Sequence, residues 1–400
     1  MSSSATELHS LRPLMPTVYL PAVLFGIGQG AILPVIALTA RELGASVGLA
    51  SLIVALLGIG QLFGDLPAGS FAARIGERRA MVGSVALITV ALVLCVLASQ
   101  VWMLAVAICV VGIASAVWGI ARHTYLTEVV PYQLRARAMS TLGGSHRIGA
   151  FAGPFLGAGA MHLWGTNGSY IVHIATAGAA ALLVGFIKEP IKPKRPDKAE
   201  GSLRDTVKVL RDHLPVFATL GSGAMMVGIV RASRAAVIPL WAESIGVDGT
   251  TTSIIFGLSG AVDMLMFYPA GKAMDKFGRA FVAVPCMAVM GVSLLLLPLT
   301  HSALTLLLVA LLLGFGNGLG SGIILTLGSD VSPKAGRAQF LGGWRLCADT
   351  GTALGPVIVS GVTVAIALGP AIWAIAAIGF TGAAALKRWI PHPEPALAER

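Results

Sequence analysis

The sequence predicts an all-α polytopic membrane protein whose twelve transmembrane helices form two related six-helix bundles. Hydrophobic residues make up 56% of the 400 residues and charged residues only 12%, whereas about 25% of the residues in a typical soluble domain are charged. The mean hydropathy is +0.84. Apolar runs long enough to cross a membrane recur along the chain, and related motifs return at a constant distance, which indicates a duplication.

The apolar runs define twelve expected helices, because each crossing of the hydrocarbon core needs about 20 apolar residues. The runs do not alternate in period two, which excludes a transmembrane barrel. The first residues lack the basic start and cleavage site of a secretory signal, so we expect the first helix to be retained. The expected spans are residues 14–40, 47–72, 79–99, 101–130, 134–163, 168–187, 214–242, 250–274, 280–300, 303–329, 338–366 and 369–387.

The basic residues predict the orientation of these helices. They fall in alternate turns, and the positive-inside rule places those turns and both termini on the cytoplasmic side of an inner (plasma) membrane, which the Ala/Gly-rich composition suggests is bacterial. The net charge of +10 is spread over turns beside apolar helices, without the aromatic platforms of a nucleic-acid-binding protein. We therefore expect no nucleic-acid partner. The basic residues of these turns are Arg74, Arg78, Arg79, Arg135, Arg137, Lys272, Lys276, Arg279, Lys334, Arg337, Lys387 and Arg388.

One polar stretch divides the chain. Residues 188–213 are the only long polar segment, with three prolines near its start and an amphipathic end. We predict an N-terminal six-helix bundle over residues 1–187, a cytoplasmic linker over residues 188–213, and a C-terminal six-helix bundle over residues 214–400.

A short motif occurs once in each half of the chain. The stretch LPAGSFAARIGERRA, residues 66–80, returns as YPAGKAMDKFGRA, residues 268–280, so that Gly69 and Gly271 are 271 − 69 = 202 residues apart. Six helices separate equivalent positions, so the two halves share one orientation, as in transporters that rock around a site at mid-membrane. The same offset joins Gly44 with Gly246, Gly112 with Gly314, Glu128 with Asp330, Pro131 with Pro333, Arg135 with Arg337, and Gly153-Pro154 with Gly355-Pro356.

These motifs resemble the signature loops of the major facilitator superfamily (MFS), in particular of its 12-helix drug/proton antiporter-like branch, and the resemblance covers nearly the full chain. The first copy departs from the family pattern, since Ala73 replaces the loop aspartate and Glu77 replaces a basic residue. Gly69 and Gly76 are expected to allow a close helix approach and a tight reversal. The resemblance implies an MFS fold, alternating access, and a cytoplasmic gate in which basic loop residues pair with acids. The gate residues are Gly69, Arg74, Gly76, Arg78, Glu128, Arg135, Gly271, Asp275, Lys276, Gly278, Arg279, Asp330 and Arg337.

A Gly-Pro motif lies in the fifth expected helix, where GAFAGPFLGA contains Gly149, Gly153, Pro154 and Gly157. Small residues four positions apart let helices approach closely, and a proline bends a membrane helix. The motif resembles the antiporter motif of the superfamily, which implies export, and the alternative is ordinary helix packing. The helix-four arginine that marks exporters in the family is missing, because Ile108 stands at that position.

Polar side chains fall near the expected midplane at three equivalent positions of each half. Charges there are costly, by about 2.5 to 3.5 kcal/mol on insertion scales, and usually mark a pathway or a pair. We predict that Asp263 or Asp349 carries a proton, with a structural ion pair to an arginine as the alternative. Arg231 and Arg234 form a positive site that either receives a carboxylate or phosphate or satisfies Asp263 and the carbonyls of a helix break. The expected cavity residues are Gln29, Gln61, Arg147, Arg231, Arg234 and Trp118.

These features favour a proton-coupled exporter, an efflux antiporter, of small amphiphilic or anionic organic compounds. The alternatives are a proton symporter that imports an organic acid or related metabolite, and a non-transporting membrane sensor or scaffold. The chain contains no HExxH, GxSxG or GxxxxGK[ST] sequence, so we expect neither an enzyme nor a primary pump. The expected partners are a small-molecule substrate, protons and the lipid bilayer, and we expect a monomer without cofactor or metal.

Overall fold

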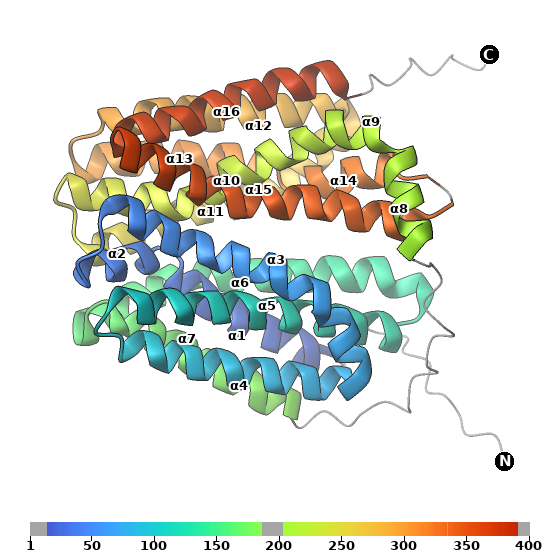
Figure 1. The fold of residues 1–400 in the computed structure, drawn as a ribbon, viewed down its shortest axis with the longest axis horizontal. Coiled ribbons are helices and arrows are strands. Elements are labelled where there is room, and N and C mark those ends of the chain that lie inside the picture. Colours follow the sequence, from blue (N-terminus) through green and yellow to red (C-terminus); the bar gives the residue numbers. More distant parts are fainter. Residues whose placement is uncertain (1–13, 186–202, 334, 391–400) are drawn as a thin grey trace. The chain divides into compact units, whose positions relative to one another are not determined.

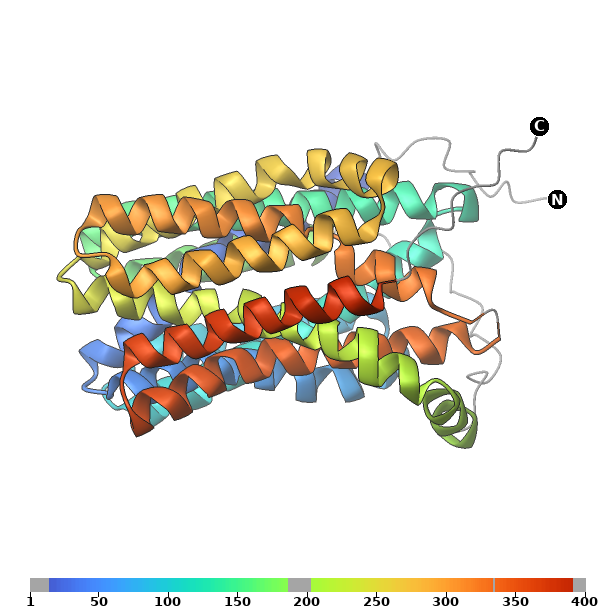
Figure 2. The same ribbon diagram turned by 90° about the horizontal axis from the view of Figure 1, so that it is seen from above.

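Helices and the turns between them account for all of the residues that the structure describes. The computed structural model describes residues 14–185, 203–333 and 335–390. Within each of its two compact units the long helices run side by side along one common direction (Figures 1 and 2). The predicted all-α polytopic membrane fold is confirmed.

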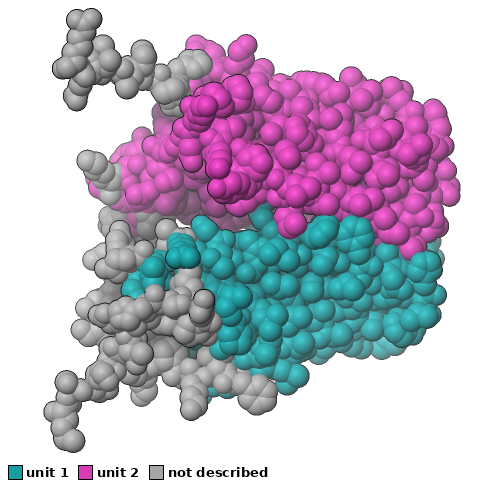
Figure 3. Space-filling model, turned by 180° about the vertical axis from the view of Figure 1, so that it is seen from behind, with its two compact units in different colours: residues 1–44, 56–195 teal, residues 45–55, 196–400 magenta. Residues whose placement is uncertain are grey.

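The chain divides into two compact units (Figure 3). Unit 1 holds residues 1–44 and 56–195, and unit 2 holds residues 45–55 and 196–400. Residues 45–55 belong to unit 2 because they pack there, and Oγ of Ser51 donates a hydrogen bond of 2.8 Å to the carbonyl oxygen of Pro356. The predicted linker, residues 188–213, lies in part outside the described residues.

The first half of the described chain contains one short π-helix and seven α-helices. Their turns are short, as the sequence predicts. They are η2 (Met15–Tyr19), α1 (Leu20–Ile32), α2 (Val35–Glu42), α3 (Val47–Ile75), α4 (Glu77–Val96), α5 (Val101–Val129), α6 (Tyr132–Trp164) and α7 (Asn167–Gly185).

The second half begins with a helix from the predicted linker. This helix, α8, packs against the start of α15, where a Cβ at Gly336 would meet Val209 and one at Gly343 would meet Leu210. The elements are α8 (Leu203–Asp212), α9 (Leu214–Val216), η3 (Phe217–Gly221), α10 (Ser222–Ser244), α11 (Gly249–Phe277), α12 (Arg279–Leu296), η4 (Leu297–Leu299), α13 (Ala303–Leu319), α14 (Ile323–Asp330), α15 (Arg337–Ala365) and α16 (Leu368–Trp389).

Eleven helical segments of the described ranges are long and apolar enough to cross a membrane. The other expected span, residues 134–163, lies on α6, which is 33 residues long. This helix is less apolar than the rest because it contains His146, Arg147 and many glycines. Its length still exceeds the roughly 20 residues that a crossing requires.

The duplication is visible in the backbone. Helices α3 and α11 begin at Val47 and Gly249, which are 249 − 47 = 202 residues apart, and both are 29 residues long. The reversals that follow them use equivalent glycines, Gly76 with φ of 92° and Gly278 with φ of 89°. Only glycine adopts such angles without steric cost, so the tight reversal predicted for the signature loops is confirmed in both halves.

Two expected helices are broken. The span predicted over residues 14–40 is interrupted at Pro34, which cannot donate a backbone hydrogen bond and crowds the preceding turn. The span predicted over residues 303–329 is interrupted after Leu319, and Gly322 there has a left-handed φ of 83°. The glycines of this second break lie inside an apolar run, so hydropathy alone did not reveal it.

Glycines let two pairs of helices meet backbone to backbone. A Cβ at Gly149 or Gly153 of α6 would collide with the carbonyl oxygen of Val23 or Ile27 on α1. Unit 2 repeats this contact 202 residues later, where Gly351 and Gly355 of α15 face the carbonyls of Met225 and Ile229 on α10. The helix-five motif therefore has a packing role, which was the alternative to an export motif.

Replacing Gly153 by alanine should destabilise the protein, because the added methyl group would collide with the Ile27 carbonyl oxygen. Overpacking of this kind costs about 1–3 kcal/mol, and thermal melting of the purified protein in nanodiscs would measure it. Gly159→Ala is the matched control on the same helix, since a Cβ there meets nothing within 4 Å. Equal melting temperatures of the two variants would contradict the packing role.

The start of α11 offers a test by pH. The Asp248 carboxylate accepts hydrogen bonds from the Thr251 hydroxyl at 2.6 Å and from the Thr251 amide at 2.9 Å, and these bonds lower its pKa. Asp248→Ala should cost about 1 kcal/mol at pH 7. A lowered pKa means that the contribution is complete above the ordinary carboxyl pKa of about 4 and is lost as the pH falls through the lowered value.

The measurement is the melting temperature of the wild type and of Asp248→Ala at pH 7 and at pH 3. The difference between the two proteins should shrink at the lower pH. A difference that stays constant or grows on acidification would show that the carboxylate does not cap the helix.

Candidate functional site

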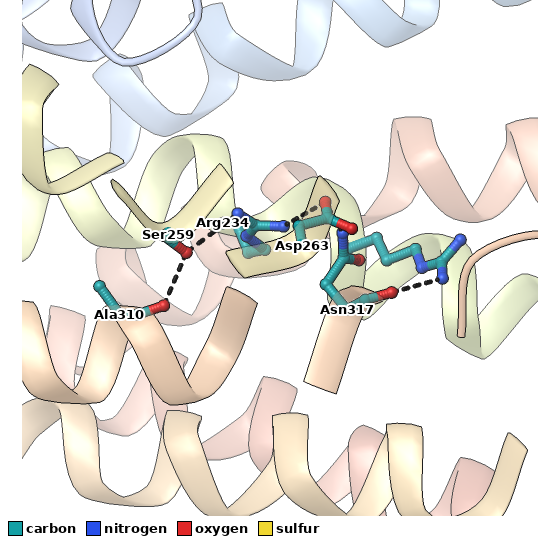
Figure 4. Close-up of polar contacts among 6 residues, drawn as sticks. Arg234, Ser259, Asp263, Ala310 and Asn317 are labelled. Carbon is teal, nitrogen blue, oxygen red and sulfur yellow. Dashed lines mark hydrogen bonds and ion pairs between the residues drawn. The ribbon is translucent and has the colours of Figure 1, made fainter. Parts of the chain in front are cut away.

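A buried arginine and a carboxylate face each other in unit 2. Arg234 on α10 is 8% exposed, and its Nη1 lies 3.7 Å from Oδ2 of Asp263 on α11. Its Nη2 donates a hydrogen bond of 3.2 Å to Oγ of Ser259, one turn earlier on α11 (Figure 4). The guanidinium carbon also lies 5.7 Å from the ring centre of Phe256. Arg234 is therefore held by an acid, a hydroxyl and an aromatic ring of one neighbouring helix.

An asparagine of α13 joins this pair. Nδ2 of Asn317 donates a hydrogen bond of 2.5 Å to Oδ2 of Asp263, so one carboxylate oxygen serves both Arg234 and Asn317. Oγ of Ser259 in turn donates to the carbonyl oxygen of Ala310 on α13 at 2.6 Å (Figure 4). The network thus ties together α10, α11 and α13.

Two glycines bring α13 close enough for these bonds. A Cβ at Gly314 would collide with the backbone of Ser259, and one at Gly318 would collide with the backbone of Asp263. Because Asn317 directly precedes Gly318, its side chain comes to lie beside the carboxylate. The sequence analysis missed Asn317, although it is the one amide side chain in the apolar run over residues 304–322.

Arg231 lies three residues before Arg234 and hydrogen-bonds a main-chain carbonyl at the end of the broken helix, α13. Its Nη2 donates a hydrogen bond of 3.1 Å to the main-chain carbonyl of Asn317, in the last turn of α13. The carbonyl end of a helix carries partial negative charge and lacks internal partners. Satisfying carbonyls at a helix break was one of the two roles predicted for the two arginines.

Four buried polar atoms of this set have no hydrogen-bond partner among the described residues. They are Oδ1 of Asp263, Oδ1 of Asn317, Nε of Arg231 and Nε of Arg234. One carboxylate oxygen is therefore available to a proton. The set contains two guanidinium groups and one carboxylate, so it can also accept a further negative charge.

Asp349, the other predicted proton carrier, pairs within its own helix. Its Oδ2 accepts a hydrogen bond of 3.2 Å from Nε of Arg345, one turn earlier on α15. The Arg345 and Asp349 side chains are 58% and 34% exposed, and an exposed pair one helical turn apart contributes little energy. Both predicted carriers are thus paired with an arginine, Asp349 within its own helix and Asp263 with Arg234 of another helix.

The predicted cavity residues of unit 1 lack an equivalent acid. Gln29, Gln61 and Arg147 are half-buried, and Gln61 stands at the position equivalent to Asp263. Trp118 on α5 is 1% exposed, and its ring stacks on Phe25 of α1 with centroids 5.0 Å apart. Trp118 is therefore packed inside its unit and presents no open surface in this structure.

The predicted gate residues of the second half form an ion pair. Nε of Arg279, at the start of α12, lies 2.7 Å from Oδ2 of Asp330 at the end of α14, and Nη2 donates to Oδ1 at 3.3 Å. Asp275 acts on the same guanidinium through its charge. Arg337 donates to Oγ of Ser329 at 2.8 Å, and Nζ of Lys276 lies 5.0 Å from the ring centre of Phe277.

The gate residues of the first half are arranged differently. Arg78 donates to the carbonyl oxygen of Gly185, and Nε of Arg135 donates to that of Val130 at 3.2 Å. Glu128 is exposed and lies within electrostatic range of another acid, Glu77. The expected bridge from the loop arginines, Arg74 among them, to Glu128 is not formed among the described residues.

The close helix approach expected at Gly69 is wrong for this structure. A Cβ added at Gly69, or at the equivalent Gly271, would meet nothing within 4 Å. The reversal needs glycine for its backbone angle at Gly76 and Gly278, each of which directly precedes the next helix. Gly69 and Gly271 have no such requirement in the described packing.

Comparison with known sequences decides the family. The family model of the Major Facilitator Superfamily matches residues 18–233 and again residues 220–399. The chain belongs to the Major Facilitator Superfamily. The family that the resemblance implied is therefore confirmed. No group of three or more His, Cys, Asp or Glu side chains suited to a metal ion occurs in the described ranges.

Curated relatives of this MFS protein are known from Mycobacterium tuberculosis. The uncharacterized MFS-type transporters MT1926 (strain CDC 1551 / Oshkosh) and Rv1877 (strain ATCC 25618 / H37Rv) are each 27% identical to the chain over 192 residues. The match covers 46% of this chain and 28% of each relative, so the chain spans less than a third of their length.

Solved transporters share the fold. A POT family transporter in complex with 5-aminolevulinic acid has a TM-score of 0.76 at 13% identity, covering 93% of this chain and 95% of that one. A D-xylose-proton symporter has a TM-score of 0.71 at 15% identity, with 93% and 95% covered. The nucleoside transporter NupG has a TM-score of 0.71 at 16% identity, with 92% and 98% covered.

Asn317→Ala should lower the free energy of unfolding by about 1–3 kcal/mol, because it removes a hydrogen bond from a partly buried carboxylate. The loss should be smaller in the Asp263→Asn background, where the charge that Asn317 stabilises is already gone. Melting of the two single variants and the double variant, in a double-mutant cycle, measures this coupling. Strictly additive losses would show that the two side chains do not interact.

Proposed function

We propose that this MFS protein is a proton-coupled transporter of small amphiphilic or anionic organic compounds, in which Asp263 carries the proton. The observation that supports the proposal is the state of this carboxylate: Oδ2 is shared by Arg234 and Asn317, while Oδ1 has no hydrogen bond among the described residues. An ionisable residue inside membrane helices is costly to place and usually functional.

The pairing of Asp263 with Arg234 links the proton to the charge of the substrate. While Asp263 is ionised, it attracts the guanidinium of Arg234 across 3.7 Å. Protonation removes that attraction, so Arg234 becomes available to a carboxylate or phosphate on a substrate. A proton and an anion then favour each other's binding, since the linkage is reciprocal. This electrostatic coupling supports symport of a small organic anion with a proton.

Export by proton antiport is the second candidate. An amphiphile that carries a positive charge would compete with the proton for Asp263, and such competition couples the two in opposite directions. The resemblance of Gly149, Gly153, Pro154 and Gly157 to the antiporter motif favours this candidate, although the glycines also serve helix packing. A non-transporting sensor or scaffold would move neither proton nor substrate.

Alternating access follows from the proposed arrangement of the chain. We assign the N-terminal bundle to residues 1–187, the linker to residues 188–213 and the C-terminal bundle to residues 214–400, with both termini in the cytoplasm and a monomer in the inner membrane. The ion pair between Arg279 and Asp330 supports a cytoplasmic gate in the second half. The gate of the first half then uses the same loop without the equivalent pair.

Proton flux in proteoliposomes with an internal pH dye tests the proposal. Carboxylate-bearing and cationic amphiphiles are added outside, and protein-free liposomes correct for passive entry of undissociated acid. We expect Asp263→Asn to slow the proton flux by about tenfold or more, which corresponds to a barrier higher by about 1.4 kcal/mol or more. Asp349→Asn should retain most of the flux. Asp212→Asn, an exposed carboxylate of α8, is the control for a lost charge.

The sign of the pH change separates the candidates. An anion that enters with a proton acidifies the interior, whereas a cation that enters in exchange for a proton makes the interior more alkaline. Substrate entry without any pH change in the wild type would refute proton coupling. Asp263 would then be a structural partner of Arg234.

A further inference from the structure

One face of α5 in unit 1 carries three buried polar side chains. Ser115, Trp118 and Arg122 follow one another at i, i+3 and i+7, which places them on one side of the helix, and they are 6%, 1% and 8% exposed. Oγ of Ser115, Nε1 of Trp118, and Nε and Nη1 of Arg122 have no hydrogen-bond partner among the described residues. Indole and guanidinium N–H groups only donate and a serine hydroxyl both donates and accepts, so this face has more donors than acceptors.

Arg122 has no counter-ion in the described ranges of the chain. None of the ion pairs or hydrogen bonds found there joins its guanidinium to a carboxylate. Its guanidinium carbon lies 5.9 Å from the ring centre of Trp118, a contact that stabilises a cation without neutralising it. His146 on α6, whose Nδ1 also has no partner there, lies within electrostatic range of both Arg122 and Arg147.

The duplication explains why unit 1 lacks the acid. The offset of 202 residues places Gln61 where unit 2 has Asp263, and Ser115 where unit 2 has Asn317. In unit 2 these two positions bond to each other and neutralise a buried arginine. In unit 1 both positions are uncharged. A buried charge without a partner destabilises a fold. A bound ligand with one negative charge supplies the counter-ion that Arg122 lacks among the described residues.

We infer that Arg122 binds the carboxylate of a small organic monoanion, with the Ser115 hydroxyl as an additional donor. One guanidinium matches one negative charge, and its planar fork fits the two oxygens of a carboxylate. Nε and Nη1 of Arg122 are buried without a partner among the described residues, so both can donate to a bound carboxylate. Phe25, whose ring stacks on that of Trp118 with centroids 5.0 Å apart, gives this region an apolar wall. This site rests on the proposed function, narrows its substrate class to monocarboxylates, and is a second anion site, in unit 1, in addition to Arg234 of unit 2.

Equilibrium binding of benzoate to the purified full chain in nanodiscs tests the site. Titration calorimetry at pH 7, with no proton gradient, should show that Arg122→Gln weakens benzoate binding by at least about tenfold. Arg137→Gln removes an exposed arginine of α6 and should bind benzoate like the wild type. Benzamide, the neutral counterpart, should not bind.

Three outcomes would overturn the inference: no benzoate binding by the wild type, equal binding by Arg122→Gln, or inorganic phosphate binding as tightly as benzoate. The melting temperature of ligand-free Arg122→Gln should equal or exceed that of the wild type, because an unmatched charge is removed. If Arg122→Gln does not fold, Arg122→Lys tests the site, since it keeps the charge and loses the fork. The proposed function fails separately, when benzoate binds at Arg122 but drives no proton flux.

Discussion

Contact between helix backbones at glycines is the constraint on which the arrangement of unit 2 depends. Gly228 of α10 faces the backbone of α15, and Gly314 and Gly318 of α13 face the backbone of α11. The first contact fixes the rotation of α10, so that its arginines face α11 and α13. The second brings Asn317 to the carboxylate of Asp263. Helix association in lipid relies on such close packing, because lipid tails are as apolar as the side chains.

Much of the fold could be predicted because its signals are local in the sequence. Hydropathy located the helices, and the 202-residue offset predicted the equivalence of Gly76 and Gly278, which share one backbone conformation. The partners of Asp263 could not be predicted in the same way. A membrane helix is apolar on its lipid-facing and its protein-facing sides, so composition does not reveal its rotation. In the sequence Asn317 is therefore one polar residue in an apolar run, although in the structure it completes the hydrogen-bond network of Asp263.

The same limit explains the mixed outcome at the loops. Gly76 is required by its own backbone angle, which sequence reasoning can address, whereas the expected approach at Gly69 depends on a neighbouring helix and is not found. The two halves have kept their backbone geometry and diverged in charge. Unit 2 has an acid beside its arginines, and unit 1 has an amide, Gln61, at the equivalent position. Duplication thus supplied two similar frames that can hold different chemical groups.

The break in the tenth expected helix divides it into α13 and the short helix α14. Helix α14 has 8 residues, which is about 12 Å at 1.5 Å per residue; it starts after the left-handed Gly322 and ends at Asp330. Arg231 bonds to the end of α13, before the break, through the carbonyl of Asn317. Arg279 bonds to the far end of α14 through Asp330. Between these two ends α14 packs on α15, where Nε1 of Trp344 donates a hydrogen bond of 2.7 Å to the carbonyl oxygen of Ile324. The carbonyl of Asn317 accepts from Arg231 and its side chain donates to Asp263, so Asn317 stands between the break and the carboxylate, and the short helix α14 leads from the break to the ion pair of Arg279 and Asp330.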